Sequence, residues 1–472
     1  MTSSALVQES GVVLETGPLL RLLPPQPITR PLPPLPPSSP IHPGWTSQTY
    51  ILPAAFPRSY KGSTRPASSP RSPFPTPPKP GQRINPNEAY QALLGPQVEG
   101  FSYKVKLGDQ TELDGQEQLA VVVNRYRPEK KVEGKGLTLV FSHANGFYKE
   151  VWETTLKTLL QQIEADGRSL PIEEVWALDC INQGDSAVLN RQVLGDVFNW
   201  ADHGRDLLSF VISFIDSPTL SSPPSQGPTL LSPAKDVAPE RFSLDHASPT
   251  ASGPSIPSPR TYRDRLIVGI GHSLGGAATA FASSALPSLF SSIILIDPVL
   301  PTPHVSTRSM EKLTTGALVR KERWSSREEA LESFGKKPFF QAWDRRALEA
   351  YCEFGLEEVE GGGVKLKCEA RDEALTFCDP MSVASRRACS RLSLLPRSLP
   401  VHFIFADSNR SVLPEENIDY ILGTAVPHAS ASRVKGAGHL VVHEKPEETA
   451  RLIGEFVERT YPREDGKRKA KL

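Results

Sequence analysis

Short apolar runs alternate with amphipathic stretches from about residue 100 onward, and this alternation predicts the fold class. Strands are expected at 101–107, 118–128, 136–142, 173–180, 265–271, 291–298 and 399–407. Apolar residues at helical spacing predict helices at 151–163, 199–215, 275–286 and 450–461. The first two strands are expected to pair with each other. Strands that alternate with helices indicate βαβ units, so the sequence predicts an α/β protein with a mostly parallel central sheet flanked by helices.

Three segments interrupt this rhythm. Of the 46 prolines, 20 lie in residues 1–80 and 10 in residues 217–260, so a head at 1–85 and an insertion at 217–263 are expected to be disordered. Residues 305–395 are charged and rich in helix formers, which predicts a helical cap over the carboxyl edge of the sheet. One domain at 100–460 and a basic tail at 461–472 complete this division.

Charge and composition exclude several classes of function. The 53 basic and 53 acidic residues balance, which gives no support to nucleic-acid binding. No apolar stretch approaches the roughly 20 residues of a membrane-spanning helix, and the first residues lack the pattern of a secretory leader. The five cysteines form no CxxC pair, so free thiols in a reducing compartment are expected.

The sequence Gly271-His272-Ser273-Leu274-Gly275 carries the strongest chemical signal. It fits G-x-S-x-G, and it lies between a predicted strand and a predicted helix of small residues, as a nucleophile elbow requires. Glycine is needed on both sides because the turn is tight and side chains there would collide. The helix that follows directs its amino terminus at the serine, which favours developing negative charge. Ser273 is therefore the candidate nucleophile.

A serine nucleophile needs a base, and His439 is the first choice among the ten histidines. It follows a glycine, lies just before the final helix and comes after the serine in the chain, which is the order expected beside such an elbow. His443 is the weaker candidate, and its alternative is a surface position near the helix start. His272 lies within the elbow, where packing is the simpler role for its ring.

Two acids could orient the histidine, and the sequence leaves both open. Asp407 ends the strand at 399–407, where this kind of fold most often places its acid, but the following residues fit the usual register poorly. Asp297 ends the strand at 291–298, and a minority of such enzymes use that position. An aspartate there is also frequent as a purely structural residue. The register argument favours Asp297 slightly.

An oxyanion site needs two backbone N–H groups. Leu274, directly after the nucleophile, is expected to supply one. The turn His143-Ala144-Asn145-Gly146 follows an earlier strand, and by position Asn145 is expected to supply the other. No metal ion or organic cofactor is needed for this chemistry.

Two short motifs suggest partners. Ala470-Lys471-Leu472 is a close variant of the S-K-L peroxisomal address, which a receptor would bind through its terminal carboxylate. A solvated basic tail is the alternative. The segment from Arg30 to Pro37 has the spacing of a polyproline ligand for an SH3-type groove. A proline-rich segment that binds nothing is the more common situation.

With these residues in hand, the chain resembles the α/β-hydrolase superfamily over about residues 100–460. WALDCINQGDSAV is similar to the D-x-x-G-x-G-x-S stretch of that superfamily, with Asn182 in place of the first glycine. A narrower resemblance is to fungal peroxisomal α/β-hydrolases, a group with a peroxisomal lipase and hydrolases of toxin biosynthesis. It rests on SHANGFYKEVWE, NQGDSA, NWADHGRDLL and the cap stretch KERWSSREEALESF, followed by FQAWDRRALEAYCEFGLE.

The resemblance implies a peroxisomal serine hydrolase that cleaves an ester or thioester of a fatty-acyl or polyketide-like acid. The cap aromatics Trp324, Phe339, Phe340, Trp343 and Phe354 would supply apolar surface for the acyl chain, although each could equally serve packing. Two alternatives remain at this stage. One is a fold retained for binding or scaffolding, and the other is a C–C bond hydrolase of a secondary-metabolite pathway.

Overall fold

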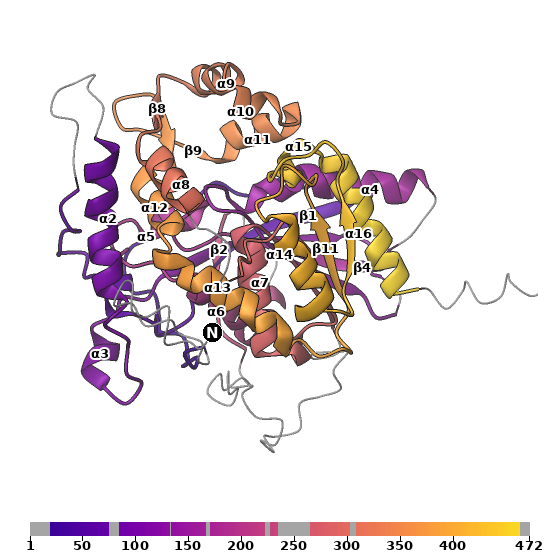
Figure 1. Ribbon diagram of the computed structural model, residues 1–472, viewed down its shortest axis with the longest axis horizontal. Helices are drawn as coiled ribbons and strands as arrows, with labels where there is room; N and C mark the ends of the chain where they lie inside the picture. Colours follow the sequence, from indigo (N-terminus) through magenta and orange to yellow (C-terminus); the bar gives the residue numbers. More distant parts are fainter. Residues whose placement is uncertain are drawn as a thin grey trace, which may run out of the picture.

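A nine-stranded sheet forms the centre of the molecule in the computed structural model (Figure 1), which describes residues 19–74, 85–132, 134–166, 170–221, 227–234, 265–302 and 308–462. The strand order is β12-β11-β7-β6-β3-β4-β2-β1-β5. The strands are β1 (Trp45–Pro53), β2 (Ala120–Pro128), β3 (Leu137–Ser142), β4 (Ile172–Leu178), β5 (Thr229–Leu230), β6 (Leu266–His272), β7 (Ser292–Ile296), β11 (Val401–Phe405) and β12 (Ser430–Arg433). The predicted α/β class and mostly parallel sheet are confirmed.

Strand direction divides the sheet into two parts. The strands β4, β3, β6, β7, β11 and β12 run parallel, whereas β2 is antiparallel to both β1 and β4. The central strands are buried on both faces, which explains their continuous apolar sequences. The carboxyl ends of the parallel strands therefore meet along one edge, where β3 ends at Ser142, β6 at His272 and β7 at Ile296.

Helices cover both faces of the sheet. The helices α4 (Trp152–Ala165) and α16 (Pro446–Thr460) pack together on one face, while α6 (Trp200–Ser213), α7 (Leu274–Ala285) and α13 (Val383–Arg391) pack on the other. The remaining body helices are α2 (Pro86–Gly100), α3 (Gln110–Asp114), α5 (Gly184–Asn190), α14 (Glu415–Tyr420) and α15 (Val441–Glu444). Short helical turns lie at Lys61–Ser63, Lys149–Val151, Pro218–Ser221, Pro287–Leu289, Pro380–Ser382, Leu392–Leu394 and Ile421–Ala425.

The expected strand pair is wrong in one partner. Residues 101–107 form turns with a single bridge from Lys104 to Tyr60, whereas β2 pairs along its whole length with β1, from Trp45 opposite Pro128 to Pro53 opposite Ala120. Because the surrounding segment is rich in proline, the sequence pattern did not predict β1. Its own composition, WTSQTYILP, is rich in the β-branched and aromatic residues that favour strands.

The expectation of a disordered head is likewise wrong for residues 19–74. The reason lies partly in α6, whose Asp202, Arg205 and Asp206 are buried charges that need partners. The guanidinium of Arg58 lies 2.6 Å from Asp206, and Arg205 donates to the carbonyl oxygen of Leu20 at 2.7 Å. Arg205 pairs with Asp202 within α6 at 2.6 Å, so the head supplies the positive charge that balances Asp206.

The polyproline motif is engaged within the molecule. Arg30 donates to Asn190 Oδ1 at 2.7 Å and to the carbonyl oxygen of Gln118. Leu32 and Leu35 pack beside Ile51. These contacts occupy the cation and the apolar residues of the motif, which does not fit the expected ligand for an SH3-type groove.

The insertion and the cap both contain more regular structure than expected. Within 217–263, the described part includes β5, which extends the sheet beside β1, and residues 235–264 lie outside the described part. The cap elements are α8 (Arg308–Leu318), β8 (Arg323–Trp324), α9 (Arg327–Gly335), α10 (Pro338–Gln341), α11 (Arg345–Phe354), β9 (Leu356–Glu358), β10 (Val364–Leu366) and α12 (Ala370–Phe377). A small sheet of order β8-β10-β9 therefore accompanies the expected helices.

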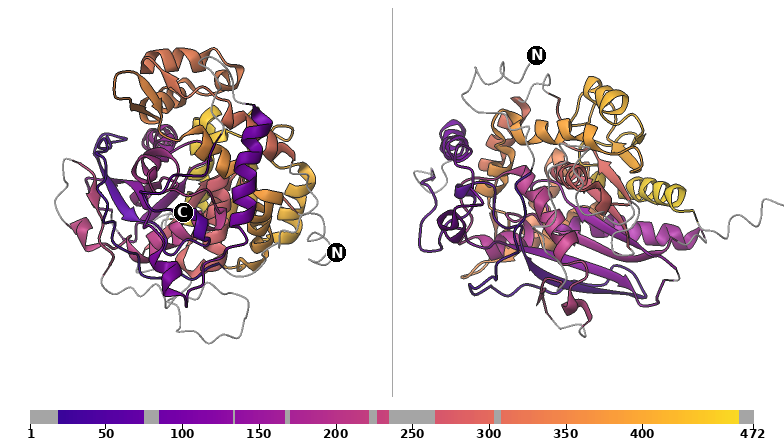
Figure 2. Two further views of the ribbon diagram at one scale, coloured as in Figure 1. Left: turned by 90° about the vertical axis from the view of Figure 1, so that its left-hand side faces the viewer. Right: turned by 90° about the horizontal axis from the view of Figure 1, so that it is seen from below.

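The cap elements pack against one side of the body of the domain. Figure 1 shows α9, α10 and α11 at the top of the molecule, where α11 contacts α4 and α15 of the body directly, while α8 and α12 lie closer to α2. In Figure 2, the body helix α2 runs beside the cap, where it packs against the cap helices α8 and α12. Among the described residues, no helix has the length and apolar character needed to cross a membrane.

Candidate active site

Ser273 lies at the sharp turn between β6 and α7. Its backbone has φ 55° and ψ −114°, a conformation that a non-glycine residue adopts only where the surroundings hold it. The surroundings are the end of β7, because the Ser273 N–H donates to the carbonyl oxygen of Ile296 at 3.0 Å. The side chain is 6% exposed, so its hydroxyl reaches a nearly enclosed space.

Close approach of the backbone explains both flanking glycines. A Cβ atom at Gly271 would lie 2.2 Å from the carbonyl oxygen of Gly275. A Cβ atom at Gly275 would lie 2.2 Å from the carbonyl oxygen of Ser142, at the end of β3. The second contact also brings the turn after β3 against the first turn of α7, so the two predicted oxyanion segments are neighbours.

His439 is the histidine that reaches the serine. Its Nε2 lies 2.9 Å from Ser273 Oγ, and its Nδ1 lies 2.7 Å from Asp297 Oδ2. The imidazole is 29% exposed, whereas the carboxylate of Asp297 is fully buried. The arrangement is that of a nucleophile, a base and an orienting acid held in series.

Asp297 is held by three further donors. Its Oδ1 accepts from Ser411 Oγ at 2.6 Å and from the N–H of Ala406 at 3.1 Å, and its Oδ2 accepts from the N–H of Val412 at 3.0 Å. Burial by itself would raise the pKa of Asp297, but the hydrogen bond from His439 and these donors outweigh it and lower the pKa. The carboxylate is therefore ionised and fixed in orientation next to the imidazole.

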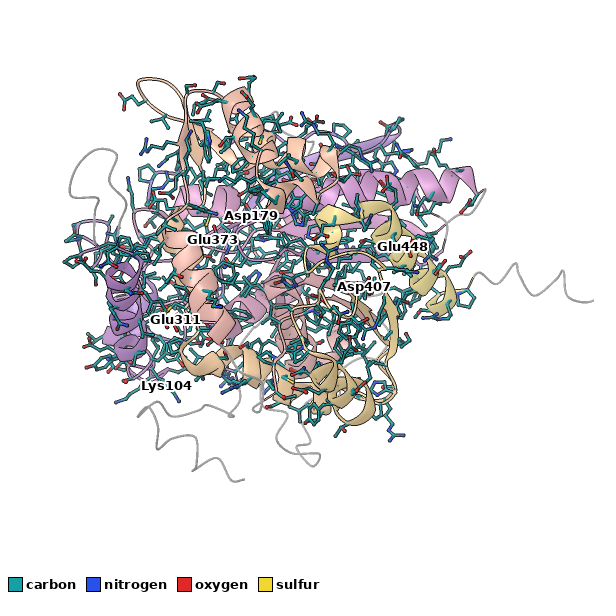
Figure 3. All side chains as sticks on the ribbon, turned by 45° about the horizontal axis from the view of Figure 1, so that its top comes forward. Lys104, Asp179, Glu311, Glu373, Asp407 and Glu448 are labelled. Carbon is teal, nitrogen blue, oxygen red and sulfur yellow. The ribbon has the colours of Figure 1, made fainter. Side chains whose placement is uncertain are left out.

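Asp407 lies outside this series. It accepts hydrogen bonds from the N–H groups of Gly436 at 2.8 Å and Ser408 at 2.9 Å, and these bonds lower its pKa. In Figure 3 it lies toward the yellow C-terminal elements, away from Glu373 on the cap side. The structure thus brings Asp297 to His439 and gives Asp407 the local task of closing the loop before Gly436.

The other two candidate histidines are buried beside the site without facing the serine. His272 Nε2 donates to the carbonyl oxygen of His439 at 2.9 Å, and burial followed by repulsion from His439 lowers its pKa to about 3. The ring of His443 packs on Phe147 and Trp343, with centroid distances of 4.1 and 4.5 Å. The expected surface position for His443 is therefore wrong.

The two expected oxyanion donors lie at the same wall. Leu274 is the first residue of α7, so its N–H has no partner within the helix. Asn145 lies in the turn after β3, and both residues line the cavity that contains Ser273. The side chain of Asn145 points to other partners, since it donates to the carbonyl oxygen of Glu373 at 3.0 Å. No hydrogen-bond partner of the Asn145 backbone N–H is found among the described residues.

A cavity of about 640 Å³ extends from Ser273 and His439 into the cap. Its walls are largely apolar and include Phe339, Phe340 and Trp343, three of the five cap aromatics named from the sequence. The other apolar lining residues come from both the body and the cap: Ala144, Phe147, Trp200, Leu274, Val299, Leu313, Ala317, Tyr351, Phe377, Val412 and Leu440. Trp324 and Phe354 are packed into the core instead.

Sequence reasoning missed the residues that hold the site in place. Ser411 and Gln183 are the main examples, because neither belongs to a motif with a known spacing. Ser411 lies four residues after Asp407, in a loop whose sequence gives no signal that this hydroxyl donates to Asp297. Gln183 hydrogen-bonds to Asn145 and Gly146 in the turn after β3, and it lies in the NQGDSA stretch, where its residue type gives no signal of this contact.

No metal centre emerges from the described ranges, in which no group of three or more His, Cys, Asp or Glu side chains could hold an ion. The tripeptide Ala470-Lys471-Leu472 and the rest of 463–472 lie outside the described residues.

Comparison with known families agrees with this architecture. The model of the alpha/beta hydrolase family matches residues 139–452. The chain belongs to the alpha/beta hydrolase family. It is similar to the peroxisomal membrane protein LPX1 of Saccharomyces cerevisiae, with 26% identity over 328 residues that cover 66% of this chain and 72% of the yeast protein. The resemblance to fungal peroxisomal hydrolases is thereby confirmed.

Two further relatives come from other fungi. The type I acyl-CoA thioesterase mpaH of Penicillium brevicompactum is 26% identical over 240 residues, which cover 50% of this chain and 43% of that protein. This alpha/beta hydrolase therefore matches less than half of the thioesterase's length. The abhydrolase domain-containing protein AKT2 of Alternaria alternata is 22% identical over 222 residues, covering 41% of this chain and 83% of AKT2.

The solved structure of the peroxisomal alpha-beta-hydrolase Lpx1 from Saccharomyces cerevisiae has the same fold. Its TM-score is 0.59 at 21% identity, with 90% of this chain and 92% of the yeast chain covered. This likeness over most of both chains supports the α/β-hydrolase fold of this chain.

Proposed function

We propose that this alpha/beta hydrolase is a serine hydrolase that cleaves an ester or thioester of a fatty-acyl or polyketide-like acid. The observation that carries the proposal is the series Ser273 Oγ, His439 and Asp297, with distances of 2.9 and 2.7 Å, at the wall of an apolar cavity. A serine, a base and an orienting acid in this order are the machinery of acyl transfer.

In the proposed reaction, Ser273 attacks the acyl carbonyl carbon while His439 Nε2 takes the hydroxyl proton. Asp297 keeps the second ring proton on Nδ1 and stabilises the imidazolium that forms. The N–H groups of Leu274 and Asn145 would bind the oxyanion, helped by the amino terminus of α7. The imidazolium then returns its proton to the leaving alcohol or thiol, and water activated by the same histidine releases the acid.

The cavity supports the choice of an acyl substrate. Its apolar walls exclude water from a hydrocarbon chain, and its volume of about 640 Å³ lies in the range of sites for medium-sized ligands. The thioester part of the proposal is supported by the similarity to the acyl-CoA thioesterase mpaH.

Covalent labelling with a fluorophosphonate probe tests this proposal. The native chain is expected to be labelled and Ser273→Ala is expected to remain unlabelled. Loss of a triad serine costs on the order of 10⁶ in turnover, so residual labelling of Ser273→Ala would assign the reactive group elsewhere. Acyl-CoA and aryl-ester panels with graded chain lengths then separate thioester from ester substrates. A folded native chain that the probe does not label would overturn the hydrolase assignment.

We propose a peroxisomal location, supported by the similarity to yeast LPX1 and by the sequence of Ala470-Lys471-Leu472. An import receptor would bind the terminal tripeptide. A fluorescent fusion that keeps the native C-terminus is expected to be punctate and to overlap a peroxisomal marker, and deletion of Leu472 is expected to leave it diffuse. A fusion that stays punctate after the deletion would remove the tripeptide as the address.

A further inference from the structure

Gln183 is a fully buried amide that makes two hydrogen bonds to the turn after β3. Its Oε1 accepts from the N–H of Gly146 at 3.0 Å, and its Nε2 donates to Oδ1 of Asn145. Because the amide offers both a donor and an acceptor, this one side chain holds two successive residues of the turn, and we call this pair of hydrogen bonds the clamp. The turn is one of the two segments that the proposed oxyanion site needs.

Asn145 extends the clamp to the cap. Its Nδ2 donates to the carbonyl oxygen of Glu373 in α12 at 3.0 Å. The Asn145 side chain therefore accepts a hydrogen bond from Gln183 in the body and donates one to Glu373 in the cap. The body, the turn and the cap helix are joined by one continuous set of hydrogen bonds through Gln183 and Asn145.

The segment that carries Gln183 is itself rigid. Asp179 Oδ1 accepts from the N–H of Lys149 at 2.8 Å, and Oδ2 accepts from the N–H of Ser186 at 3.3 Å. Gly184 has φ 57°, and a Cβ atom there would lie 2.6 Å from the Asp179 carboxylate. Because the loop is fixed at both ends, Gln183 can act as an anchor rather than follow the turn.

The neighbouring histidine orients the peptide group that carries the Asn145 N–H. The N–H of Cys180 donates to His143 Nε2 at 3.0 Å, so Nδ1 carries the proton and donates to the carbonyl oxygen of Ala144 at 2.8 Å. A planar trans peptide then points the N–H of Asn145 away from His143. The next N–H, that of Gly146, is taken by Gln183. Of these two N–H groups, the clamp therefore leaves that of Asn145 for the oxyanion.

We propose that Gln183 is a positioning residue, which fixes the Asn145 N–H for the oxyanion and links that geometry to the seating of α12. The proposal rests on the proposed hydrolase function. Gln183 lines no part of the cavity and contacts no reacting atom, so its effect is expected in transition-state stabilisation rather than in substrate binding.

The substitution Gln183→Met tests the proposal, because it keeps the length of the side chain and removes both hydrogen bonds. Gln97→Met is the matched control. Gln97 is also a buried bridging amide, which donates to the carbonyl oxygens of Phe198 and Cys378 and accepts from the N–H of Phe198, but it does not touch the turn. Both variants are assayed for kcat, KM and melting temperature on one ester that the native enzyme turns over.

Gln183→Met is expected to lower kcat by about 10- to 100-fold, less than direct loss of an oxyanion donor, with KM changed less than about threefold. Gln97→Met is expected to lower the melting temperature while kcat stays near the native value. A native kcat in Gln183→Met, or equal losses of kcat in both variants in step with their melting temperatures, would overturn the proposal.

A second variant keeps the proposal testable if Gln183→Met does not fold. Asn145→Ala retains the backbone N–H and removes the side-chain links to Gln183 and Glu373, so it is expected to reproduce part of the kcat loss. The double variant is expected to be non-additive, because both substitutions break the same hydrogen bond. Additive losses would overturn the proposal. Failure of the native chain to react with the fluorophosphonate probe is a separate result, which bears on the hydrolase function itself.

Discussion

Asp297 Oδ2 lies 2.7 Å from His439 Nδ1, although 142 residues separate the two in the chain. Asp297 and Asp407 follow neighbouring strands, β7 and β11, so both end at the same edge of the sheet. The difference between them is orientation, because Asp297 has φ 33° and aims its carboxylate inward, whereas Asp407 is bound to Ser408 and Gly436.

Asp297→Asn and Asp407→Asn are therefore expected to behave differently. Loss of the orienting carboxylate costs about 10⁴ in turnover, because the histidine takes the wrong tautomer. Asp407→Asn keeps one of the two acceptor oxygens, and this side chain makes no hydrogen bond to Ser273, His439 or Asp297, so activity within about threefold of native is expected. Turnover of a chromogenic ester and the rate of probe labelling measure both. A steep loss in Asp407→Asn alone would reverse the assignment of the acid.

The turn that contains Asn145 gives a second prediction. Gly146 has φ 82°, and a Cβ atom there would lie 2.9 Å from Glu373 Oε1, whose carboxylate is paired with Arg320. Gly146→Ala is expected to lower the free energy of unfolding by about 2–3 kcal/mol, from backbone strain and from the clash. Urea unfolding measures this loss.

Gly44→Ala is the matched control for backbone strain alone. Gly44 has φ 74°, and a Cβ atom there would meet nothing within 4 Å. It is expected to lose only about 1–2 kcal/mol of unfolding free energy. Equal losses in the two variants would show that the contact with Glu373 adds nothing at Gly146.

The sequence predicted the strands β3, β4, β6, β7 and β11 and the helices α4, α6, α7 and α16, because apolar runs and helical periodicity are local signals, whereas the short strands β5 and β12 were not predicted. Ser273 was found the same way, since the elbow needs small residues at fixed offsets. The acid could not be chosen, because the choice between Asp297 and Asp407 depends on one backbone dihedral angle and on donors from Ser411 and Val412.

The head was misjudged for a different physical reason. Proline frequency indicates a chain that forms few backbone hydrogen bonds, and it says little about contacts made by side chains. The sign that the head is ordered lies in α6, where Asp202, Arg205 and Asp206 occupy buried positions of an amphipathic helix. Buried charges need partners from elsewhere in the chain, and Arg58 supplied one.

The cap wall of the cavity is expected to set the acyl chain length. Ala317 in α8 is buried and lines the cavity, so Ala317→Leu would fill part of the space for the chain. A methylene group too many in such a pocket costs about 10- to 200-fold in kcat/KM, so the loss should be confined to the longest acyl esters.

A series of esters of increasing chain length measures this preference. Thr315→Leu adds similar bulk to the same helix at a position outside the cavity lining, and it is expected to leave the preference unchanged. A uniform loss across all chain lengths in Ala317→Leu would point to distortion of the cap instead of a narrower cavity.

His443 supplies a prediction about stability and pH. Neither of its ring nitrogens has a hydrogen-bond partner among the described residues, and burial followed by the nearby His272 and His439 holds its pKa well below the usual 6.5. Below about pH 6.5 the unfolded chain takes up a proton at this side chain that the folded protein does not bind. The unfolding free energy therefore falls as pH falls from 7 to 5.

His443→Phe removes this proton uptake and keeps the ring packed against Phe147 and Trp343. At pH 7 the variant is expected to be about 1 kcal/mol more stable, because the buried ring nitrogens no longer lack partners. At pH 5 the advantage should grow by about 2 kcal/mol, since 1.5 pH units separate that pH from the pKa of an unfolded histidine. Urea unfolding at both pH values measures the difference. An advantage that stays constant between the two pH values would mean that His443 takes up the proton in the folded protein as well.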